Sequence, residues 1–553
     1  MRRFTLLFSF FVLAISVYAV PALPGQWKVL TLADGTQVRA ELKGDEFGHY
    51  WKAVDGNCYT ESAQEGIFQL CDSKKIAEKA QAKRAVRKQV VRRKTSFGGR
   101  NNFVGKKKGL LILAQFKNKE FEEEHTLDLY KDIANKVGFT SDLGFKGSVK
   151  DYFLDQSNNK FEIDFDVVGP LPLPENYGYY GAPNGDSNDT YPGLMAATAC
   201  QLADEYVDFK DYDWDGDGEV EQVFIIYAGL GQAAGGDANT IWPHEWHLQY
   251  SDYGNKLSLD GVTIDTYACG AELTKAGHIT GGVGIEGIGT ICHEYTHCLG
   301  IPDMYDTDGE NYGMANWDLM CSGSYNGGSF SPAGYTSYER MCCGWLDPIV
   351  LNDDTVITGM KALGDGGEAY IIYNDAHRDE YYLLENRQQK GWDEGLAGSG
   401  LLVIHVDYVE ELWAYNLVNN TTSYNGYNEQ QRCTVIPADG DFGKLDIGTD
   451  VYPSNGNNKL TDRSTPRAYL YNKNNDGRLY MTKPITDITH TDGLISFVFK
   501  NQLKNKVPTA ITTLDMKKSS SNNIYDLNGR YVGTDINNLQ KGIYIINGKK
   551  VVK

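Results

Sequence analysis

Residues 291–306, ICHEYTHCLGIPDMYD, carry the side chains of this sequence that are best suited to chemistry. His293 and His297 are four positions apart, so on an α-helix they lie one turn apart on one face and can direct both imidazoles at one metal ion. Glu294 lies about 100° further round the helix, within reach of a metal-bound water but off the ligand face. Zinc lowers the pKa of bound water and polarises a carbonyl, and a nearby carboxylate takes the proton. The spacing therefore predicts a zinc site suited to hydrolysis.

The third ligand of this candidate site is predicted to be Asp303, where the longer pattern HExxHxxGxxH would have a histidine. Gly300 comes three residues after His297, and glycine tolerates the left-handed conformation that ends a helix. The chain can turn there and bring position 303 back beneath the metal. A carboxylate oxygen is an acceptable zinc ligand, and the fourth position is left for water. The alternative is two core histidines and a surface aspartate, because HExxH alone also occurs by chance.

A second candidate metal site is the acidic loop DYDWDGDGEVE at residues 211–221. Alternating carboxylates and a sharp glycine turn suit Ca²⁺, which takes six to eight oxygen ligands. We predict that calcium is bound by the alternating aspartates of this loop: Asp213, Asp215 and Asp217. Further candidates in the same loop are Asp211, Glu219 and Glu221. The alternative interpretation is a solvated acidic turn.

Two other groups of reactive side chains have both functional and structural interpretations. His244 and Glu245, in the stretch IWPHEW, are candidates for the wall of a substrate cleft, and burial in the core explains them equally well. Cys58 and Cys71 flank a predicted hairpin, so a cross-strand disulfide is the expected pairing in an oxidising compartment. The remaining cysteine pairings cannot be derived from the sequence.

An α/β domain at residues 101–350 is predicted to position the zinc-binding helix. Residues 109–116 and 220–231 are apolar runs typical of buried strands, and residues 192–207 have helical spacing. Residues 147–169 combine a helix start with an alternating strand. Strands that alternate with helices favour an α/β arrangement.

The length and charge of the chain bound its organisation and its partners. A chain of 553 residues is too long for one compact core and predicts several domains. The net charge of −20 makes nucleic acid an unfavourable partner. No segment after the N-terminal 19 residues is long and apolar enough to span a membrane.

The N-terminal 100 residues are predicted to be removed in two stages. Residues 1–19 begin with two arginines, continue with an uncharged apolar run and end in small residues, which is typical of an export signal. Residues 20–100 form a predicted prosegment, with a small β unit followed by a basic stretch. Residues 74–108 contain fourteen Lys or Arg and one acidic residue. This stretch is either a solvated helix face or a linker open to a trypsin-like activating protease, and the two are compatible.

The C-terminal part of the chain is predicted to be all-β. Short alternating strands in residues 351–502 favour a β-sandwich-like domain. Residues 503–553 contain a polar linker and a last small β unit with Asn-Gly turns.

Several motifs resemble one family. HEYTHCLGIPDMYD resembles the active-site helix of the immune inhibitor A-like metallopeptidases, a metzincin-related family of secreted bacterial zinc enzymes whose pattern has Asp at this position. NWDLMCSGSYNG, residues 316–327, resembles the methionine turn beneath the metal and places Met320 in it. The likeness covers roughly residues 100–500 and includes SVKDYFLDQSNNKFEIDFDVVGP, WDGDGEVEQVFIIYAG, IWPHEW and YYLLENRQQKGWDEGLAGSGLLVIHVD. The C-terminal stretch IYDLNGRYV…LQKGIYIINGKKVVK resembles the sorting domains of type IX secretion.

The resemblance implies a metzincin-like catalytic domain followed by a β-sandwich-like domain and a small β tail. It implies a secreted or cell-surface zinc endopeptidase, made as a zymogen, in which Glu294 activates a zinc-bound water. Protein or peptide substrates and the type IX machinery are the implied partners, beside the calcium and the activating protease predicted above from the acidic loop and the basic stretch. Two alternatives remain. One is a catalytically silent surface adhesin or glycan-binding protein, although a pure binder has no need of Glu294. The other is a zinc hydrolase that acts on another amide, such as one in a cell-wall peptide.

Overall fold

The computed structural model describes residues 20–84 except 63 and 65, residues 103–502 except 185–187, 277–281, 423–427 and 443–447, and residues 524–526 and 531–553 except 547–548. The predicted export signal and most of the basic stretch lie outside these residues. The chain divides into two compact units, residues 1–501 and residues 502–553. Within the described residues, no helix has the length and apolar character needed to cross a membrane.

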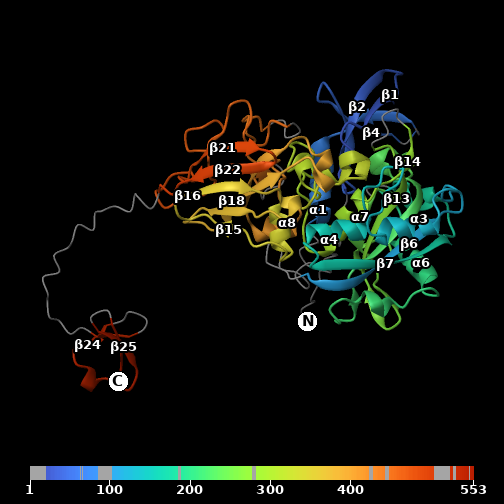
Figure 1. The fold of residues 1–553 in the computed structure, drawn as a ribbon. Coiled ribbons are helices and arrows are strands. Elements are labelled where there is room, and N and C mark those ends of the chain that lie inside the picture. Colours follow the sequence, from blue (N-terminus) through green and yellow to red (C-terminus); the bar gives the residue numbers. More distant parts are fainter. Residues whose placement is uncertain are drawn as a thin grey trace, which may run out of the picture. The chain divides into compact units, whose positions relative to one another are not determined.

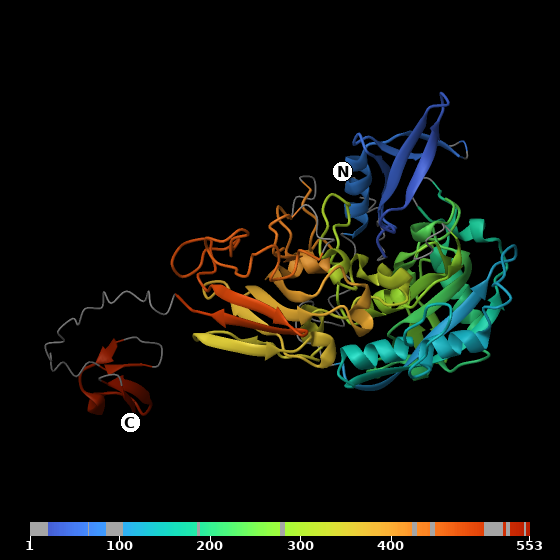
Figure 2. The ribbon, with the colours of Figure 1, turned by 45° about the horizontal axis from the view of Figure 1, so that its top comes forward.

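The first described element of the larger unit is a closed five-stranded barrel, drawn in dark blue in Figures 1 and 2. Its strands are β1 (Trp27–Leu32), β2 (Gln37–Gly44), β3 (His49–Ala53), β4 (Cys58–Glu61) and β5 (Ile67–Leu70). Helix α1 (Ser73–Arg84) follows it. Leu30, Ala40 and Phe68 fill a small apolar core. The predicted hairpin is β4–β5, but Cys58 and Cys71 are free cysteines. The expected disulfide between them is therefore absent, and the Cys58 thiol donates to Gly56 O instead.

A six-stranded sheet with helices on both faces forms the centre of residues 103–343. Its strands are β6 (Gly105–Gln115), β7 (Phe161–Pro172), β9 (Val223–Leu230), β10 (His244–His247), β13 (Thr266–Thr274) and β14 (Gly284–Ile285). The main path has the order β10-β13-β9-β6-β7, in which β10 alone is antiparallel to its neighbour. A smaller sheet joins β8 (Glu219–Val220), β11 (Leu257–Leu259) and β12 (Val262–Ile264).

Alternation along the strands distributes the apolar side chains between two cores. On β6, Leu111 and Leu113 enter the core shared with α3 (Leu127–Asn135), α4 (Val149–Gln156) and α7 (Gly289–Cys298). Leu110 and Ile112 enter the opposite core with α6 (Pro192–Ala203). The mixed helix and strand character predicted for this region is therefore confirmed. The short helices α5 (Tyr177–Gly181) and α8 (Ser337–Cys342) complete it.

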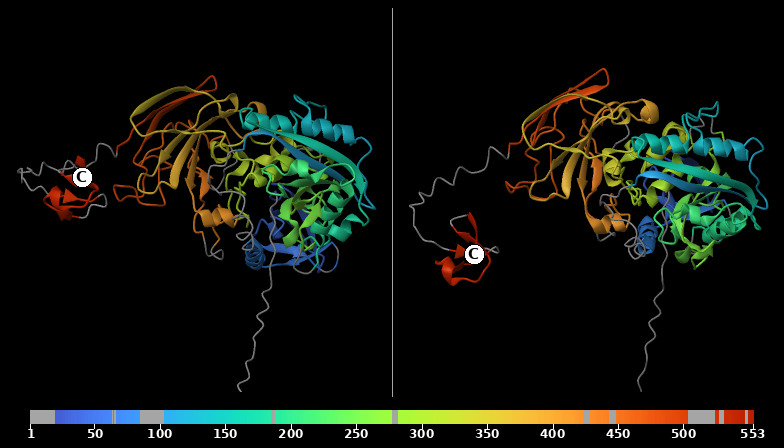
Figure 3. Two further views of the ribbon diagram at one scale, coloured as in Figure 1. Left: turned by 90° about the horizontal axis from the view of Figure 1, so that it is seen from below. Right: turned by 60° about the horizontal axis from the view of Figure 1, so that its bottom comes forward.

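Two further sheets follow, and their yellow and orange strands are visible in Figure 3. One has the order β15-β17-β18-β19-β20: Ile349–Val350, Tyr370–Tyr373, Glu380–Arg387, Gly400–Asp407 and Cys433–Val435. The other has the order β16-β22-β21: Thr355–Met360, Leu494–Phe499 and Ile485–Thr491. One face of the first sheet, including Tyr382 and Val403, packs against Phe497 of the second. The other face, including Leu383 and Ile404, joins the core that contains α7.

The smaller unit contains a four-stranded sheet of order β24-β23-β25-β26. These strands are Tyr531–Gly533, Ile524–Tyr525, Ile543–Ile546 and Lys549–Val552. The predicted small β unit at the C-terminus thus forms strands. Its similarity to a sorting domain stays a prediction.

Candidate metal centre and catalytic site

Helix α7 places the predicted zinc-binding residues in the interior. His293 and Glu294 are fully buried, and His297 is 6% exposed. The helix ends at Cys298, because Gly300 adopts a left-handed φ of 85° and its amide donates to His297 O at 2.8 Å. This turn returns the chain toward the helix and brings Asp303 against the two histidines.

Three candidate ligand atoms converge at one point. Asp303 Oδ1 lies 3.2 Å from His293 Nε2 and 3.4 Å from His297 Nε2, and the two Nε2 atoms are 3.3 Å apart. A tetrahedral zinc with bonds of about 2.0–2.2 Å has ligand atoms separated by about 3.3–3.5 Å. The three atoms thus have the spacing of one face of a zinc tetrahedron. The carboxylate of Glu294 also lies within 4.8 Å of the two imidazoles.

Hydrogen bonds on the far side of each ring leave the Nε2 atoms available for a metal. His293 Nδ1 donates to Leu319 O at 2.9 Å, and His297 Nδ1 donates to Ile301 O at 2.8 Å. With the proton on Nδ1, each neutral ring presents the Nε2 lone pair to Asp303. Asp303 Oδ1 is buried and accepts no hydrogen bond from the described residues. A cation satisfies these three acceptor atoms together, so the residues fit a zinc ion.

The charge balance of the site favours an ionised Asp303. Burial raises the pKa of its carboxyl group, but the charge and hydrogen bonds of His297 and His293, when these rings carry their second proton, outweigh that effect and hold the pKa below its usual value. An ionised carboxylate is the form that binds a metal.

Met320 directly follows Leu319, the residue whose carbonyl binds His293, in a short irregular segment. Its side chain is fully buried, its carbonyl accepts from Met304 N at 2.7 Å and its amide donates to Asp318 Oδ1 at 2.7 Å. The preceding carbonyl, Leu319 O, is the one that orients His293. The segment predicted as a methionine turn therefore supports a ligand.

The environment of Glu294 includes the start of the described chain. Val20 N donates to Glu294 Oε1 at 3.2 Å. Trp242 Nε1 donates to Val20 O at 3.0 Å, and Tyr325 OH donates to Pro21 O at 2.8 Å. Burial raises the pKa of Glu294 well above its usual value, and the charge of Asp303 raises it further. No feature of the sequence pointed to this contact between positions 20 and 294.

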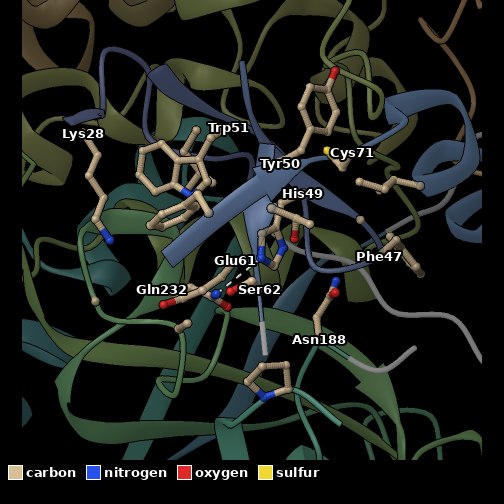
Figure 4. Close-up of a pocket in the computed structure, with 18 of the residues that line it drawn as sticks. Lys28, Phe47, His49, Tyr50, Trp51, Glu61, Ser62, Cys71, Asn188 and Gln232 are labelled. Carbon is tan, nitrogen blue, oxygen red and sulfur yellow. Dashed lines mark hydrogen bonds between the residues drawn. The ribbon is translucent and has the colours of Figure 1, made fainter. Parts of the chain in front are cut away.

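The N-terminal barrel packs against Trp242, the residue that binds Val20 beside Glu294. His49 stacks on Trp242 with ring centroids 4.7 Å apart and contacts Gln232. Figure 4 shows His49, Trp51 and Lys28 of the barrel facing Gln232 and Asn188 across a cavity of about 570 Å³. The barrel thus packs on Trp242, which binds the Val20 carbonyl, and the cavity lies between the barrel and the segments of Asn188 and Gln232.

The remaining sequence candidates fall in different settings. His244 bonds to Trp242 O at 2.6 Å and to Tyr267 OH at 3.0 Å, and burial lowers its pKa to about 4, which favours the core interpretation. Glu245 is 3% exposed. The negative charge of Glu245 also raises the pKa of Glu294, so Glu245 lies on the Glu294 side of the candidate metal centre.

The acidic loop brings its alternating aspartates together. Carboxylate oxygens of Asp213, Asp215 and Asp217 lie within 4.8 Å of one another. Asp213 accepts from the amides of Gly216 and Gly218, both at 2.8 Å. The geometry is compatible with a cation but does not require one, so calcium stays a prediction.

Comparison with known proteins finds a family that part of the chain resembles. Residues 97–343 match the family described as immune inhibitor A peptidase M6, catalytic domain. This part of the chain, which carries the candidate metal centre, is therefore similar to the peptidase M6 family. The predicted resemblance to immune inhibitor A is thereby confirmed, and a metallopeptidase family implies a metal, consistent with the centre described above.

Two relatives are similar to part of this chain. Immune inhibitor A of Bacillus thuringiensis subsp. alesti is 26% identical over 308 residues, which cover 47% of this chain and 44% of the relative. The pre-pro-metalloprotease PrtV of Vibrio cholerae serotype O1 is 28% identical over 254 residues, which cover 39% of this chain and 27% of the relative. The chain thus matches less than half the length of each relative.

Proposed function

We propose that this protein is a secreted zinc endopeptidase that is made as a zymogen. The observation that carries the proposal is the convergence of His293, His297 and Asp303, with ligand atoms 3.2–3.4 Å apart and Glu294 beside them. The match of residues 97–343 to the peptidase M6 family supports peptide bonds as the substrate. In this proposal the catalytic domain is metzincin-like and Met320 belongs to its methionine turn.

Each residue has a separate role. His293, His297 and Asp303 would hold zinc, which supplies a Lewis acid that polarises the scissile carbonyl and acidifies water. Glu294 takes the proton from the attacking water and passes it to the leaving amine. Burial and the charge of Asp303 raise its pKa, which makes the carboxylate a stronger base toward water. Leu319 O and Ile301 O keep the imidazoles in the required tautomer.

The prosegment would keep the enzyme latent by filling the substrate cleft. The segment Val20, Pro21, Ala22 and Leu23 lies along the site, and Leu23 N donates to Ala233 O at 3.0 Å. Trp242 and Tyr325 donate to its backbone carbonyls, as they could to a bound peptide. While this segment occupies the site, a substrate cannot reach Glu294. Cleavage in the basic stretch, residues 74–108, by a trypsin-like protease would allow its release.

Three further features of the proposal follow from the sequence. Residues 1–19 would direct export, so the enzyme acts outside the cell or at its surface. Asp213, Asp215 and Asp217 would bind calcium. The C-terminal sheet, β23 to β26, would serve as a type IX sorting module.

The test is proteolysis of casein by the purified protein after removal of its prosegment, with and without a chelator. We expect zinc at one equivalent per chain, activity that the chelator abolishes, and recovery of activity when zinc is added back. A processed protein that folds, holds no zinc and cleaves no protein would favour the adhesin alternative. A zinc-containing protein that cleaves only cell-wall amides would favour the other hydrolase.

A further inference from the structure

The candidate ligand Asp303 has no regular secondary structure to hold it. It follows the end of α7 in a segment, residues 299–314, that contains no strand and no α-helix. Its neighbour Met304 forms backbone hydrogen bonds with Met320 and Met314. The backbone amide of Asp303 instead donates to a side chain, Asn416 Oδ1, at 2.8 Å. Part of the support for this ligand therefore comes from 113 residues further along the chain.

Asn416 binds Asp303 twice. While its Oδ1 accepts from the Asp303 amide, its Nδ2 donates to Asp303 Oδ2. This pairing uses Oδ2 and turns the other oxygen, Oδ1, toward His293 and His297. Because the Asn416 amide is neutral, it fixes the carboxylate without neutralising it, and the negative charge stays available for a metal. Asn416 is 2% exposed, so water does not replace it.

The backbone at Asn416 explains why this residue type stands there. Helix α9 (Glu410–Ala414) ends just before it, and Asn416 adopts a left-handed φ of 57°. Leu417 N then donates to Leu412 O at 2.9 Å, which closes the helix end. Asparagine is among the few residues other than glycine that tolerate this conformation. It also supplies the donor and the acceptor that Asp303 uses.

The residues after Asn416 extend the same support along the ligand segment. Asn419 Nδ2 donates to Met304 O at 2.8 Å, Thr422 Oγ1 donates to Asp308 Oδ2 at 2.7 Å and Thr434 Oγ1 donates to Gly313 O at 3.1 Å. Beneath these polar contacts, Met304, Met320, Ile404 and Leu417 share one buried core. The downstream region therefore packs directly on the segment that carries Asp303.

We propose that Asn416 is a positioning residue for the metal centre and that the region downstream of the peptidase M6 match is needed for tight metal binding. The inference rests on the proposed function, in which Asp303 is a zinc ligand. The family match ends at residue 343, so Asn416 lies outside it. The zinc affinity of the peptidase domain is then set in part by a side chain that a chain truncated after the match would lack.

The test is the zinc dissociation constant of the full chain, measured by competition with a chromophoric chelator, for wild type and Asn416→Gly. Glycine accepts the left-handed backbone, so the change removes the amide without straining the chain. Loss of such a supporting contact typically weakens metal affinity about 10- to 100-fold. The matched control is Asn455→Gly, since Asn455 also has a positive φ, 47°, and is exposed. We expect the control to bind zinc as wild type does.

A cycle with Asp303→Ala separates positioning from general damage. If Asn416 acts through Asp303, Asn416→Gly has no further effect on zinc affinity in the Asp303→Ala background. An equal loss in both backgrounds, or wild-type affinity in Asn416→Gly, would overturn the inference. If the glycine variant does not fold, Asn416→Asp replaces it, because a carboxylate cannot donate to Asp303 Oδ2 at neutral pH. A tenfold loss in Asn416→Asp supports positioning, and unchanged affinity contradicts it. Absence of zinc from wild type would instead refute the proposed function.

Discussion

Val20 N donates a hydrogen bond to Glu294 Oε1 at 3.2 Å, across 274 positions of sequence. Val20 is also the first residue after the predicted signal cleavage site. Removal of residues 1–19 would thus turn this amide into a free amino group beside the candidate catalytic base. The contact connects two separate predictions, export and latency, because signal cleavage would create the amino group that faces Glu294.

The first prediction concerns latency. A chain that begins at Val20 should be inactive on a short peptide, and deletion of residues 20–23 should raise its activity at least tenfold without any cleavage of the basic stretch. The reason is that Val20 binds Glu294 and Trp242, and Pro21 binds Tyr325, so the proposed block is removed while the barrel strands that follow stay intact. The assay is hydrolysis of a fluorogenic peptide by the full chain.

A suitable control for this deletion is Val29→Asp, since Val29 lies on barrel strand β1 and is 56% exposed. It should leave latency unchanged. The chain without residues 20–23 could be as inactive as the chain that begins at Val20, while a chain without the whole prosegment is active. That result would contradict the prediction and would mean that the barrel alone imposes latency.

The second prediction concerns the third ligand. Asp303→Ala should lower zinc affinity more than 100-fold, because removing a ligand costs more than the 10- to 100-fold typical of supporting contacts. The measurement is metal content after dialysis against a weak chelator. A matched control is Asp306→Ala, which removes a buried carboxylate three residues away that accepts from Glu310 N and Asn311 N. Comparable zinc loss in both variants would indicate loop disruption instead of ligand removal.

The third prediction concerns stability. Arg387 is buried, and its guanidinium donates to Asp393, Glu385 and the Trp317 carbonyl. Arg387→Ala leaves two carboxylates without their buried counter-ion, so it should destabilise the fold by about 3–5 kcal/mol. Thermal unfolding followed by circular dichroism measures this.

Arg478→Ala provides the comparison for Arg387. Its ion pairs with Asp476 and Asp462 are exposed to solvent, and pairs of that kind contribute about 0–1 kcal/mol. Equal shifts of the unfolding temperature in the two variants would contradict the prediction. They would mean that the contact of Arg387 on β18 with the Trp317 carbonyl contributes no more stability than an exposed ion pair.

The fourth prediction concerns calcium. Trp214 lies within the acidic loop and can sensitise the luminescence of terbium, a calcium substitute, bound to Asp215 and Asp217. Terbium emission should appear on excitation of tryptophan, fall on addition of calcium and vanish in the Asp215→Asn, Asp217→Asn double variant. Asp34→Asn, an exposed aspartate in the barrel, should keep the signal. Emission that survives in the double variant would place the cation elsewhere.

The sequence located the centre because helical spacing is a local property. Two histidines four apart, a helix-ending glycine and an oxygen ligand three residues later are fixed by backbone geometry within eleven residues, so His293, His297 and Asp303 could be named in advance. Strands at β18 and β19 were predictable from their local apolar runs, but the predicted alternation is wrong there, because both faces of these strands are buried.

The supporting contacts could not be predicted in this way, because they join residues that only the tertiary fold brings together. Asn416 is one of several asparagines in NLVNNTT, and nothing local distinguishes the one that meets Asp303. Val20 is likewise an ordinary residue after a signal, and Arg387 an ordinary strand arginine, until packing places them against Glu294 and Trp317.

The most direct test of the central claim is proteolysis and zinc content of the processed enzyme beside its Glu294→Gln variant. Glutamine keeps the size of the side chain but cannot take a proton from water. If Glu294 is the general base and not a ligand, the variant should hold the same zinc as wild type and lose about 10²- to 10⁴-fold in kcat/KM. Full activity in Glu294→Gln, or loss of its zinc, would contradict the account.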